Sequence, residues 1–377
     1  MKRLFTLTFF LFGIVNSNAQ ISNVQEEFPL PASLSESSGA IMINGKLITH
    51  NDSGGQNELY ELDLNTQTVT RTVTITNATH IDWEDITQDD THIYIGDFGN
   101  NNGDRTDLKI YKILKTDYLI STSVTAEIIN FSYANQSDFT SNPQNTPWDA
   151  EAILSLNTTD LVLISKNWVN GISSAYIISK TPGTYSLAPL SSTLNSGGLI
   201  TGATFNTLSG KIYLVGYTTV LQPFIWSSDN FSGTDIFSGN NTQTMLSSLQ
   251  LEQTEAITYT SEKDYLLTSE RFNRNVGGFT FSDTAKLVSF STSDTTLSLK
   301  TAPTNSKNIS LYPNPVSQLL HIKGNHITYV QLLNMQSAPL YKNTGKTIDM
   351  SLYSSGIYIV KINFSDGSYT LKKVIKL

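Results

Sequence analysis

The sequence contains no cysteine among its 377 residues, and only 15% of these residues are charged. The absence of cysteine excludes disulfides, thiolate metal sites and thiol nucleophiles. The sequence also lacks any long helical stripe of apolar residues. Ser, Thr and Asn are abundant instead, together with 17 Tyr and 17 Phe. This composition favours strands and polar turns, so we predict an all-β protein.

Several catalytic motifs are missing as well. The sequence has no His-Glu-x-x-His metal motif, no Gly-x-Ser-x-Gly nucleophile turn and no glycine-rich phosphate loop after a predicted strand. A Ser-His-Asp triad stays open, because its members need not be neighbours in sequence. Any chemistry must therefore come from residues that the fold brings together.

Negative charge is concentrated in the larger part of the chain. Residues 21–306 contain 14 basic and 30 acidic residues, a net charge of −16, whereas residues 307–377 contain 8 Lys and 2 Asp. A body this acidic argues against nucleic acid as a ligand, because binding requires neutralisation of phosphates. It favours cations or neutral partners, although solubility of an exported protein would account for much of the charge.

The N-terminal segment 1–20, MKRLFTLTFFLFGIVNSNAQ, predicts a secretory signal peptide. Lys2 and Arg3 precede an apolar run of about a dozen residues, and a small-x-small pattern ends at Ala19, so we expect cleavage there or at Gln20. An uncleaved membrane anchor is the alternative, but the run is short against the ~20 residues of a membrane span. No other segment could cross a membrane, so we expect no transmembrane segment in the mature chain.

A second, smaller unit follows the body of the chain. Residues 292–307 are rich in Ser and Thr and lack periodicity, which indicates a linker. Residues 308–377 contain short alternating runs that predict the strands of a small all-β unit.

Four features of this tail occur in a characteristic order: YPNP (312–315), LLN (332–334), SGIYIVK (355–361) and the lysine-rich end KKVIKL (372–377). In these features the tail resembles the type A C-terminal sorting domain of the type IX secretion system, which occurs in Bacteroidetes. The resemblance implies a small immunoglobulin-like β-sandwich, transport across the outer membrane by the type IX machinery, and a cargo that is secreted or anchored on the outer-membrane surface. A plain immunoglobulin-like binding module is the alternative.

The body, residues 21–291, contains an internal repeat. Each unit opens with a similar phrase, and a second and a third apolar run follow it, the third in the last unit being GGFTFS (277–282). Four short strands repeated about every 50 residues are typical of β-propeller blades. We therefore predict a propeller of five blades, with a sixth blade from residues 21–34 and 284–299, or a plain β-sandwich, as alternatives. The opening phrases are SSGAIM (37–42), DWEDIT (82–87), DAEAIL (149–154), ITGATF (200–205) and QTEAIT (253–258).

Acidic residues recur at the start of three of these phrases. The first strand of each blade lines the central channel, so Glu84, Glu151 and Glu255 should meet at one mouth. Asp82 and Asp149 lie two residues earlier, on the same side of the pleat. Converging carboxylates repel each other unless a cation intervenes, and Ca²⁺ takes six to eight oxygen ligands from such groups. The predicted ligands of Ca²⁺ are Asp82, Glu84, Asp97, Asp149, Glu151 and Glu255.

Residues that follow the second strands are expected at the same mouth. An ion held there could polarise an ester or phosphoester, while Lys166 or Arg271 holds an anionic group of the substrate. Enzyme and non-enzyme interpretations both stay open. The candidate catalytic residues are Glu84, Glu151, Glu255, Lys166, Arg271 and His50.

Two structural alternatives stay open for these residues. A glutamate that begins an inner strand can accept backbone N–H bonds from the neighbouring blade and merely staple the blades together. The loop DFGNNNGD (97–104) has the oxygen density of a calcium loop but lacks the EF-hand spacing, so an Asn/Gly-rich turn is the alternative.

Four short phrases of the body are shared with known propeller families: ESSG (36–39), ELYELD (58–63), DWEDI (82–86) and SER (269–271). Through them the body, over residues 36–283, resembles SdiA-regulated-type and phytase-like propeller proteins. It is also similar, more loosely, to gluconolactonase-type propellers, in which a glutamate opening an inner strand holds a divalent ion. The resemblance implies a calcium-binding propeller without fixing a reaction. Gly-Pro follows the metal glutamate in the lactonases, whereas Asp-Ile or Ala-Ile follows here, which argues against lactonase activity.

The sequence thus predicts a type IX cargo protein whose propeller carries an acidic, calcium-binding funnel and acts as a metal-assisted ester or phosphoester hydrolase. The alternative is a non-catalytic surface propeller that binds a glycan or a protein. A flat aromatic face that uses Trp148, Trp168 and Trp226 would favour this alternative, whereas a deep cavity with clustered acids would favour the funnel.

Overall fold

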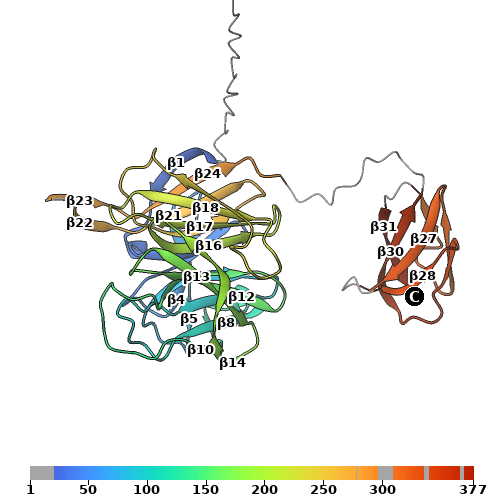
Figure 1. The fold of residues 1–377 in the computed structure, drawn as a ribbon, viewed down its shortest axis with the longest axis horizontal. Coiled ribbons are helices and arrows are strands. Elements are labelled where there is room, and N and C mark those ends of the chain that lie inside the picture. Colours follow the sequence, from blue (N-terminus) through green and yellow to red (C-terminus); the bar gives the residue numbers. More distant parts are fainter. Residues whose placement is uncertain (1–20, 277, 296–308, 335–338, 366–368) are drawn as a thin grey trace, which may run out of the picture. The chain divides into compact units, whose positions relative to one another are not determined.

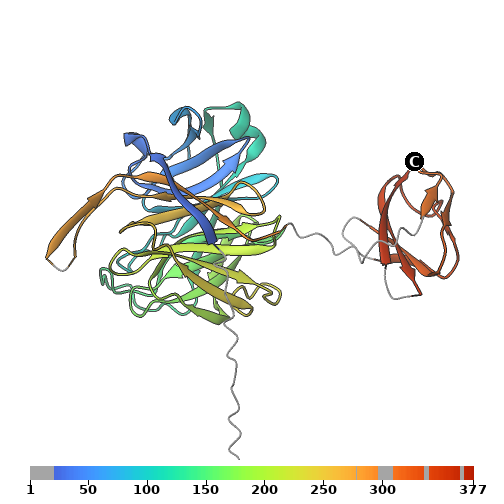
Figure 2. The ribbon, with the colours of Figure 1, turned by 90° about the horizontal axis from the view of Figure 1, so that it is seen from above.

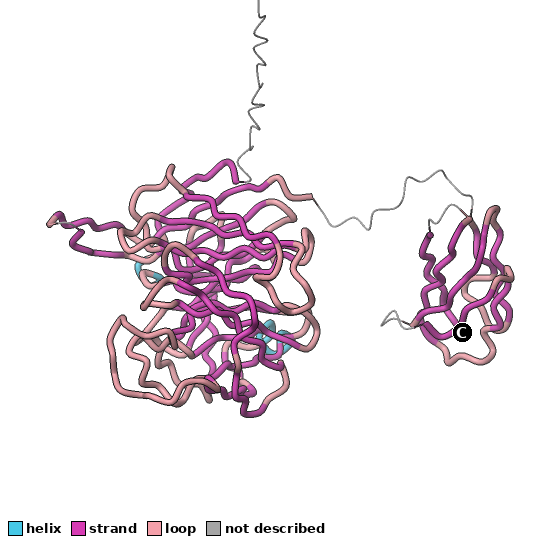
Figure 3. Tube along the Cα trace, in the orientation of Figure 1, coloured by secondary structure: helices cyan, strands magenta, loops and turns pink. Residues whose placement is uncertain are grey.

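The chain divides into two compact units, with the boundary between Thr296 and Leu297. The computed structural model describes residues 21–276, 278–295, 309–334, 339–365 and 369–377. The predicted signal peptide 1–20 and most of the predicted linker lie outside the described residues. Strands dominate both units, as the composition predicts (Figure 3).

The described part of the first unit has five sheets of four or five strands, and the first strands of these sheets form a closed ring. Each first strand contacts those of the neighbouring sheets, and the last contacts the first. Their side chains are buried along almost the whole strand. This closed ring is the β-propeller that the repeated phrases predict. The inner strands are β2 (Ser37–Ile43), β6 (Trp83–Gln88), β11 (Asp149–Ser155), β16 (Leu199–Asn206) and β20 (Thr254–Tyr259).

The other strands of each sheet follow outward from the axis. The second strands are β3 (Lys46–Asn51), β7 (His92–Asp97), β12 (Asp160–Lys166), β17 (Lys211–Tyr217) and β21 (Asp264–Ser269). The third strands are β4 (Glu58–Asp63), β8 (Lys109–Leu114), β13 (Ile172–Ser179), β18 (Pro223–Asp229) and β24 (Lys286–Thr292). The fourth strands are β5 (Thr68–Ile75), β10 (Glu127–Tyr133), β15 (Pro189–Asn195), β19 (Asn240–Met245) and β1 (Ile21–Pro29). Smaller elements are β9 (Ser123–Val124), β14 (Gly183–Leu187), the 3-10 helix η1 (Ala32–Leu34) and the helix α1 (Lys115–Ile120).

The two ends of the body meet in one sheet. β1 pairs antiparallel with β24, which pairs with β21, so the strands within the proposed sixth blade complete the fifth sheet and do not build a sixth. The end of the proposed segment 284–299, residues 296–299, lies outside the described residues. The prediction that GGFTFS supplies the third strand of this sheet is wrong. Its described part lies in β23 (Phe279–Asp283), which pairs only with β22 (Phe272–Val276) in a hairpin that projects from the body (Figures 1 and 2).

Apolar clusters fill the spaces between successive sheets. Trp83 and Tyr111 of the second sheet pack with Ile48 of the first, and equivalent clusters separate the next sheets. The last cluster joins Leu47 of the first sheet to Leu287 of the fifth, which closes the ring. Full burial of each large apolar side chain contributes about 1.5–3 kcal/mol, so these seams hold the propeller together without disulfides.

The described part of the second unit contains two small sheets that enclose one apolar core. Val330 and Val360 from one sheet and Leu320 and Ile348 from the other are fully buried in it, as expected of the predicted β-sandwich. Among the described residues of the whole chain, no helix is long and apolar enough to span a membrane. The strands of this unit are β25 (Ser310–Tyr312), β26 (Leu319–Lys323), β27 (Ile327–Leu333), β28 (Pro339–Asn343), β29 (Thr347–Asp349), β30 (Gly356–Phe364) and β31 (Tyr369–Lys376).

Candidate functional site

A β-bulge near the start of the inner strands turns one side chain out of the regular ladder. The register of β11 against β12 shifts after Ala150, which leaves Glu151 without a partner residue. Glu255 stands at the same point of β20, and the longer bulge of β6 holds Glu84 and Asp85. Bulges re-aim side chains in this way. The three glutamates singled out from the sequence are therefore the bulged residues of their strands.

The same position in the other two sheets carries hydroxyls that join neighbouring sheets. Ser38 Oγ donates a hydrogen bond of 2.5 Å to the backbone carbonyl of Glu84. Thr201 Oγ1 donates one of 2.6 Å to the carbonyl of Thr254. These two residues staple β2 to β6 and β16 to β20.

Asp85 is a third staple, which has no solvent exposure and joins β6 to two other inner strands. Its Oδ2 accepts the backbone N–H groups of Ile153 in β11, at 2.9 Å, and of Ala203 in β16, at 3.2 Å. Its Oδ1 accepts the N–H of Ile86 at 2.8 Å. Burial raises the pKa of Asp85 well above its ordinary value, and the three N–H donors oppose that rise.

The stapling that the sequence left open for the glutamates thus belongs to other residues. No backbone N–H of the described chain bonds to the carboxylates of Glu84, Glu151 or Glu255. Their burial at the channel mouth therefore needs another explanation.

The acids converge in two overlapping groups at this mouth. Oxygen atoms of Asp52, Asp82 and Glu84 lie within 4.8 Å of one another, and so do those of Glu84, Asp149 and Glu151. We call them the outer and the inner triad, and Glu84 belongs to both. A cavity of about 340 Å³, here called the funnel, opens beside them. Its lining includes Asp52, Glu84, Asn101, Gln144, Glu151, Lys166, Trp168, Tyr217, Gln253, Glu255 and Arg274.

The inner triad is largely satisfied by protein donors. Asp149 accepts the backbone N–H of Asn100 at 2.6 Å and the indole N–H of Trp168 at 2.7 Å. Glu151 forms an ion pair of 2.7 Å with Lys166. These contacts supply positive charge and hydrogen bonds to two of the three carboxylates.

The outer triad has fewer partners. Glu84 is almost completely buried, and its Oε1 has no hydrogen-bond partner among the described residues. Among the described residues, the Asp52 carboxylate accepts a hydrogen bond only from the backbone N–H of Ser53, and Asp82 faces it. A buried carboxylate oxygen without a donor costs free energy unless a cation or a proton is bound to it. Uncompensated negative charge therefore collects at the outer triad.

The electrostatics follow from this crowding. Burial, with repulsion from Asp52 and Asp149, raises the pKa of Asp82 to about 7. Burial also raises the pKa of Glu255 to about 7, although Lys166 opposes the rise. The pKa of Glu84 is raised well above its ordinary value by burial and by neighbouring carboxylates. Near neutral pH the funnel must therefore hold either protons or a cation.

Lys166 is the fixed cation of the funnel. Burial disfavours its charged form, but the surrounding carboxylates, Glu151 first, hold its pKa well above the ordinary value. Its ammonium lies 5.0 Å from the ring centre of Trp168 and 5.8 Å from that of Tyr217. The two aromatic faces and the ion pair with Glu151 keep this charge in place.

The loop of residues 97–104 closes against the outer triad. A Cβ atom at Gly99 would lie 2.0 Å from Glu84 Oε1 and 2.4 Å from Asp82 Oδ2, so only glycine allows this approach. Asn100 Oδ1 accepts the backbone N–H of Arg105 at 3.0 Å, which makes this segment a turn that supports the funnel.

Three predicted residues lie elsewhere than expected. His50 is fully buried, lines no part of the funnel, and has its pKa lowered to about 3 by burial, so it is neutral. Asp97 is paired with Arg105 at 2.9 Å and belongs to neither triad. Arg271 is 66% exposed and contacts Glu36 at 3.4 Å, outside the funnel.

Two neighbours take the places of these residues. His50 was expected at the funnel, but Asp52 lies there instead. The bulge in β2 shifts the register of β3, so that Asn51 pairs with Ser37 and Asp52 is the residue that follows this pair. Arg274, in β22, lines the funnel instead of Arg271. The register of HND (50–52) against the other units could have revealed Asp52, whereas nothing in the sequence shows that β22 leaves the sheet.

The tail can be assigned from comparison with known families. Residues 310–376 match the family described as secretion system C-terminal sorting domain. The tail is a type IX sorting domain. The sorting domain makes this chain a secreted or cell-surface-anchored cargo of the type IX machinery.

Solved structures resemble the chain only distantly. The PQQ-bound aldose sugar dehydrogenase of Streptomyces coelicolor is 9% identical, with a TM-score of 0.39 over 72% of this chain and 99% of that chain. The allergen Mala s 1 of Malassezia sympodialis is 11% identical, with a TM-score of 0.35 over 70% and 92%. The Cps50 (Swd1) β-propeller domain of Myceliophteria thermophila is 9% identical, with a TM-score of 0.34 over 95% and 99%. No curated protein matches the sequence.

Proposed function

We propose that the funnel of this secreted propeller binds a divalent cation and that Ca²⁺ is the ion it takes. The observation that carries the proposal is the unpartnered, buried Oε1 of Glu84 at the junction of two carboxylate triads. Every side chain of the two triads offers oxygen, which suits a hard cation and not a soft one.

The outer triad is the proposed position of the ion. Asp52, Asp82 and Glu84 lack the donors that satisfy Asp149 and Glu151, so a cation there relieves the larger repulsion. Lys166 compensates the inner triad and thereby limits the funnel to one strongly favoured cation position.

The finer proposal is a metal-assisted hydrolysis of an ester or phosphoester. When bound, the ion would polarise the carbonyl or phosphoryl group of the substrate. Arg274 lines the same cavity, is exposed, and is placed to hold an anionic group of the substrate. Lys166 is committed to Glu151 and serves to position that carboxylate.

The alternative, a non-catalytic propeller that binds a glycan or a protein through an aromatic face, has less support at this mouth. Trp148, Trp168 and Trp226 are each partly buried. The indole of Trp168 donates to Asp149, and that of Trp226 donates to the carbonyl of Ser196 at 3.0 Å. These rings therefore support the propeller and the triads.

Calorimetric titration of the full chain with CaCl₂ tests the proposal. We expect Glu84→Gln to weaken Ca²⁺ binding by at least about tenfold, because it removes the carboxylate shared by both triads. The matched control is Glu127→Gln, which neutralises a largely exposed glutamate on the outer strand β10 and should leave the affinity unchanged. Equal affinity of the wild type and Glu84→Gln would contradict the proposal.

The hydrolase proposal needs a separate assay. We expect the wild type to cleave p-nitrophenyl phosphate or p-nitrophenyl acetate only when Ca²⁺ is present, and Glu84→Gln to lose this activity while Glu127→Gln keeps it. Ca²⁺ binding without turnover of either compound would favour the non-catalytic alternative.

A further inference from the structure

The opposite mouth of the channel holds a second cavity, of about 410 Å³. We call it the cup. It lies at the far ends of the inner strands, and all five of these strands contribute to its wall, so it is a feature of the whole propeller. A volume of this size lies within the range of small-molecule sites. The lining includes Ile41, Ile86, Thr87, Gln88, Asp89, Asp90, Ser155, Asn157, Ala203, Thr204, Phe205, Thr207, Thr258 and Tyr259.

The cup is separated from the funnel by Asp85. The backbone N–H groups of Ile86 and Ala203, two residues of the cup wall, bond to the carboxylate of Asp85. Asp85 itself is fully buried and lines neither cavity. The cup is therefore a site of its own and shares no lining residue with the funnel.

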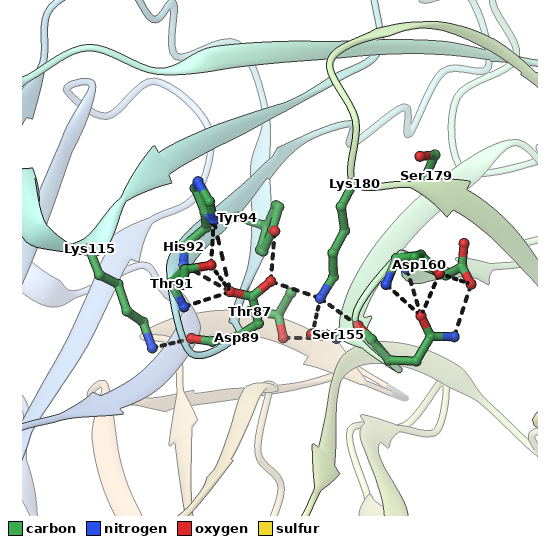
Figure 4. A network of polar contacts seen from close by, with 12 residues as sticks. Thr87, Asp89, Thr91, His92, Tyr94, Lys115, Ser155, Asp160, Ser179 and Lys180 are labelled. Atoms are coloured by element: carbon green, nitrogen blue, oxygen red, sulfur yellow. Dashed lines mark hydrogen bonds and ion pairs between the residues drawn. The ribbon is translucent and has the colours of Figure 1, made fainter. Parts of the chain in front are cut away.

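A polar network fixes the rim of the cup (Figure 4). The ammonium of Lys180 bonds to Asp89 and to the Ser155 hydroxyl, both at 2.8 Å, and to the Asn157 carbonyl at 2.6 Å. Asp89 also accepts the hydroxyl of Tyr94 at 2.8 Å. The network ties the loop after β6 to the loop after β11, so this part of the rim is formed before any ligand arrives.

The charged side chains of this rim either are paired with an opposite charge or are negative. Lys180 is saturated by its three partners, and no lysine or arginine lines the cup. Asp89 is balanced by Lys180, while Asp90 adds an exposed carboxylate. Such a wall disfavours anionic ligands.

The rest of the wall combines hydroxyls with apolar surface. The hydroxyl of Thr87 accepts the backbone N–H of Ser155 at 3.1 Å and keeps its own proton to donate. Those of Thr204 and Thr258 have no hydrogen bond with any described residue. The side chains of Phe205 and Tyr259 add aromatic surface to the wall of the cup. Hydroxyls without partners beside aromatic rings suit a ligand that has both polar edges and an apolar face.

We propose that the cup binds a neutral monosaccharide unit. The ring hydroxyls of the sugar exchange hydrogen bonds with Thr204, Thr258 and the side-chain oxygen of Gln88, whose Nε2 already donates to the Met42 carbonyl at 2.9 Å. The apolar face of the sugar packs against Phe205 or Tyr259. This site is independent of the cation proposed for the funnel, so either proposal can fail without the other.

Titration calorimetry on the full chain tests the proposal with methyl glucoside, methyl galactoside and N-acetylglucosamine as probes. We expect millimolar binding of at least one of them. Thr204→Val and Thr258→Val keep the side-chain shape but remove one hydroxyl each, and each should weaken binding by about fivefold to tenfold. The matched control is Thr184→Val, on the exposed strand β14, which should bind like the wild type. Thermal unfolding verifies that each variant is folded.

Further titrations distinguish binding at the cup from binding at the funnel and define the ligand. Glu84→Gln and EDTA should leave sugar binding unchanged, and glucuronic acid should bind more weakly than the neutral probes. A trisaccharide that ends in the best probe tells whether the cup takes free sugars or the ends of glycan chains. The proposal is overturned if no neutral probe binds at ~20 mM, if glucosamine or glucuronic acid binds more tightly than all of them, or if both valine variants bind normally.

Discussion

Replacing Asp85 by alanine is expected to destabilise the propeller by about 2–6 kcal/mol, because two buried inter-strand N–H groups lose their acceptor at about 1–3 kcal/mol each. These groups belong to Ile153 and Ala203, on two inner strands other than that of Asp85. Such a loss should lower the melting temperature by on the order of 5–20 °C for a domain of this size. Thermal unfolding followed by circular dichroism measures it.

Two further variants make the result interpretable. Asp85→Asn keeps one carbonyl oxygen that can accept both inter-strand N–H groups, so its loss should be clearly smaller than that of alanine. Asp104→Ala removes an exposed aspartate and should change the melting temperature by no more than a degree or two. If Asp85→Ala and Asp104→Ala have the same melting temperature, Asp85 is not a staple of the inner ring.

Without a divalent cation, the propeller is expected to become less stable as the pH rises from about 4 to about 7. Burial raises the pKa of Asp82 and of Glu255 to about 7, whereas unfolded carboxyl groups titrate near ~4. Between these values the folded state binds more protons than the unfolded state, so the stability falls with rising pH. Each pKa unit corresponds to about 1.4 kcal/mol. The buried His50, whose pKa is lowered to about 3, contributes in the opposite direction up to about pH 6.5. The two raised carboxyl groups outweigh this one imidazole, so the net loss should still reach several kcal/mol.

Ca²⁺ should reduce this loss, because an ion at the outer triad replaces the protons held by Asp82 and Glu84. With Ca²⁺ at about 100 times its Kd, the gain near pH 7.5 should be about 2.7 kcal/mol, and it should shrink as the pH falls to 5. Melting curves in EDTA and in CaCl₂ across this pH range measure both effects. A stability that rises with pH in EDTA, or an equal effect of Ca²⁺ at pH 5 and 7.5, would count against cation binding by these carboxylates.

The sequence was sufficient for the architecture because each inner strand has its own opening phrase. All five phrases fall on inner strands. It failed at GGFTFS, since period-2 alternation is the same in a blade strand and in the projecting hairpin β22–β23. Only the pairing of β24 with β21 shows which segment completes the sheet.

The candidate site was predicted in part for a similar reason. The spacing of the acids predicts that Glu84, Glu151 and Glu255 lie at one mouth of the channel. These three residues line the funnel together with Lys166. The spacing could not distinguish the role of Glu84 from that of Asp85, because the two are adjacent residues of the same bulge. Glu84 lines the funnel, whereas Asp85 accepts hydrogen bonds from other inner strands. The cup left no signal, because five different strands contribute its ordinary Thr, Ile and Phe residues one to three at a time.

The most direct measurement of the central claim is anomalous diffraction from crystals of the full chain soaked in CaCl₂. We predict one strong peak in the funnel within coordination distance of Glu84, with Asp52 and Asp82 as its neighbours, and no such peak in Glu84→Gln crystals. A soaked wild-type crystal without a peak at the triads, or with the same peak in the Glu84→Gln variant, would contradict the account.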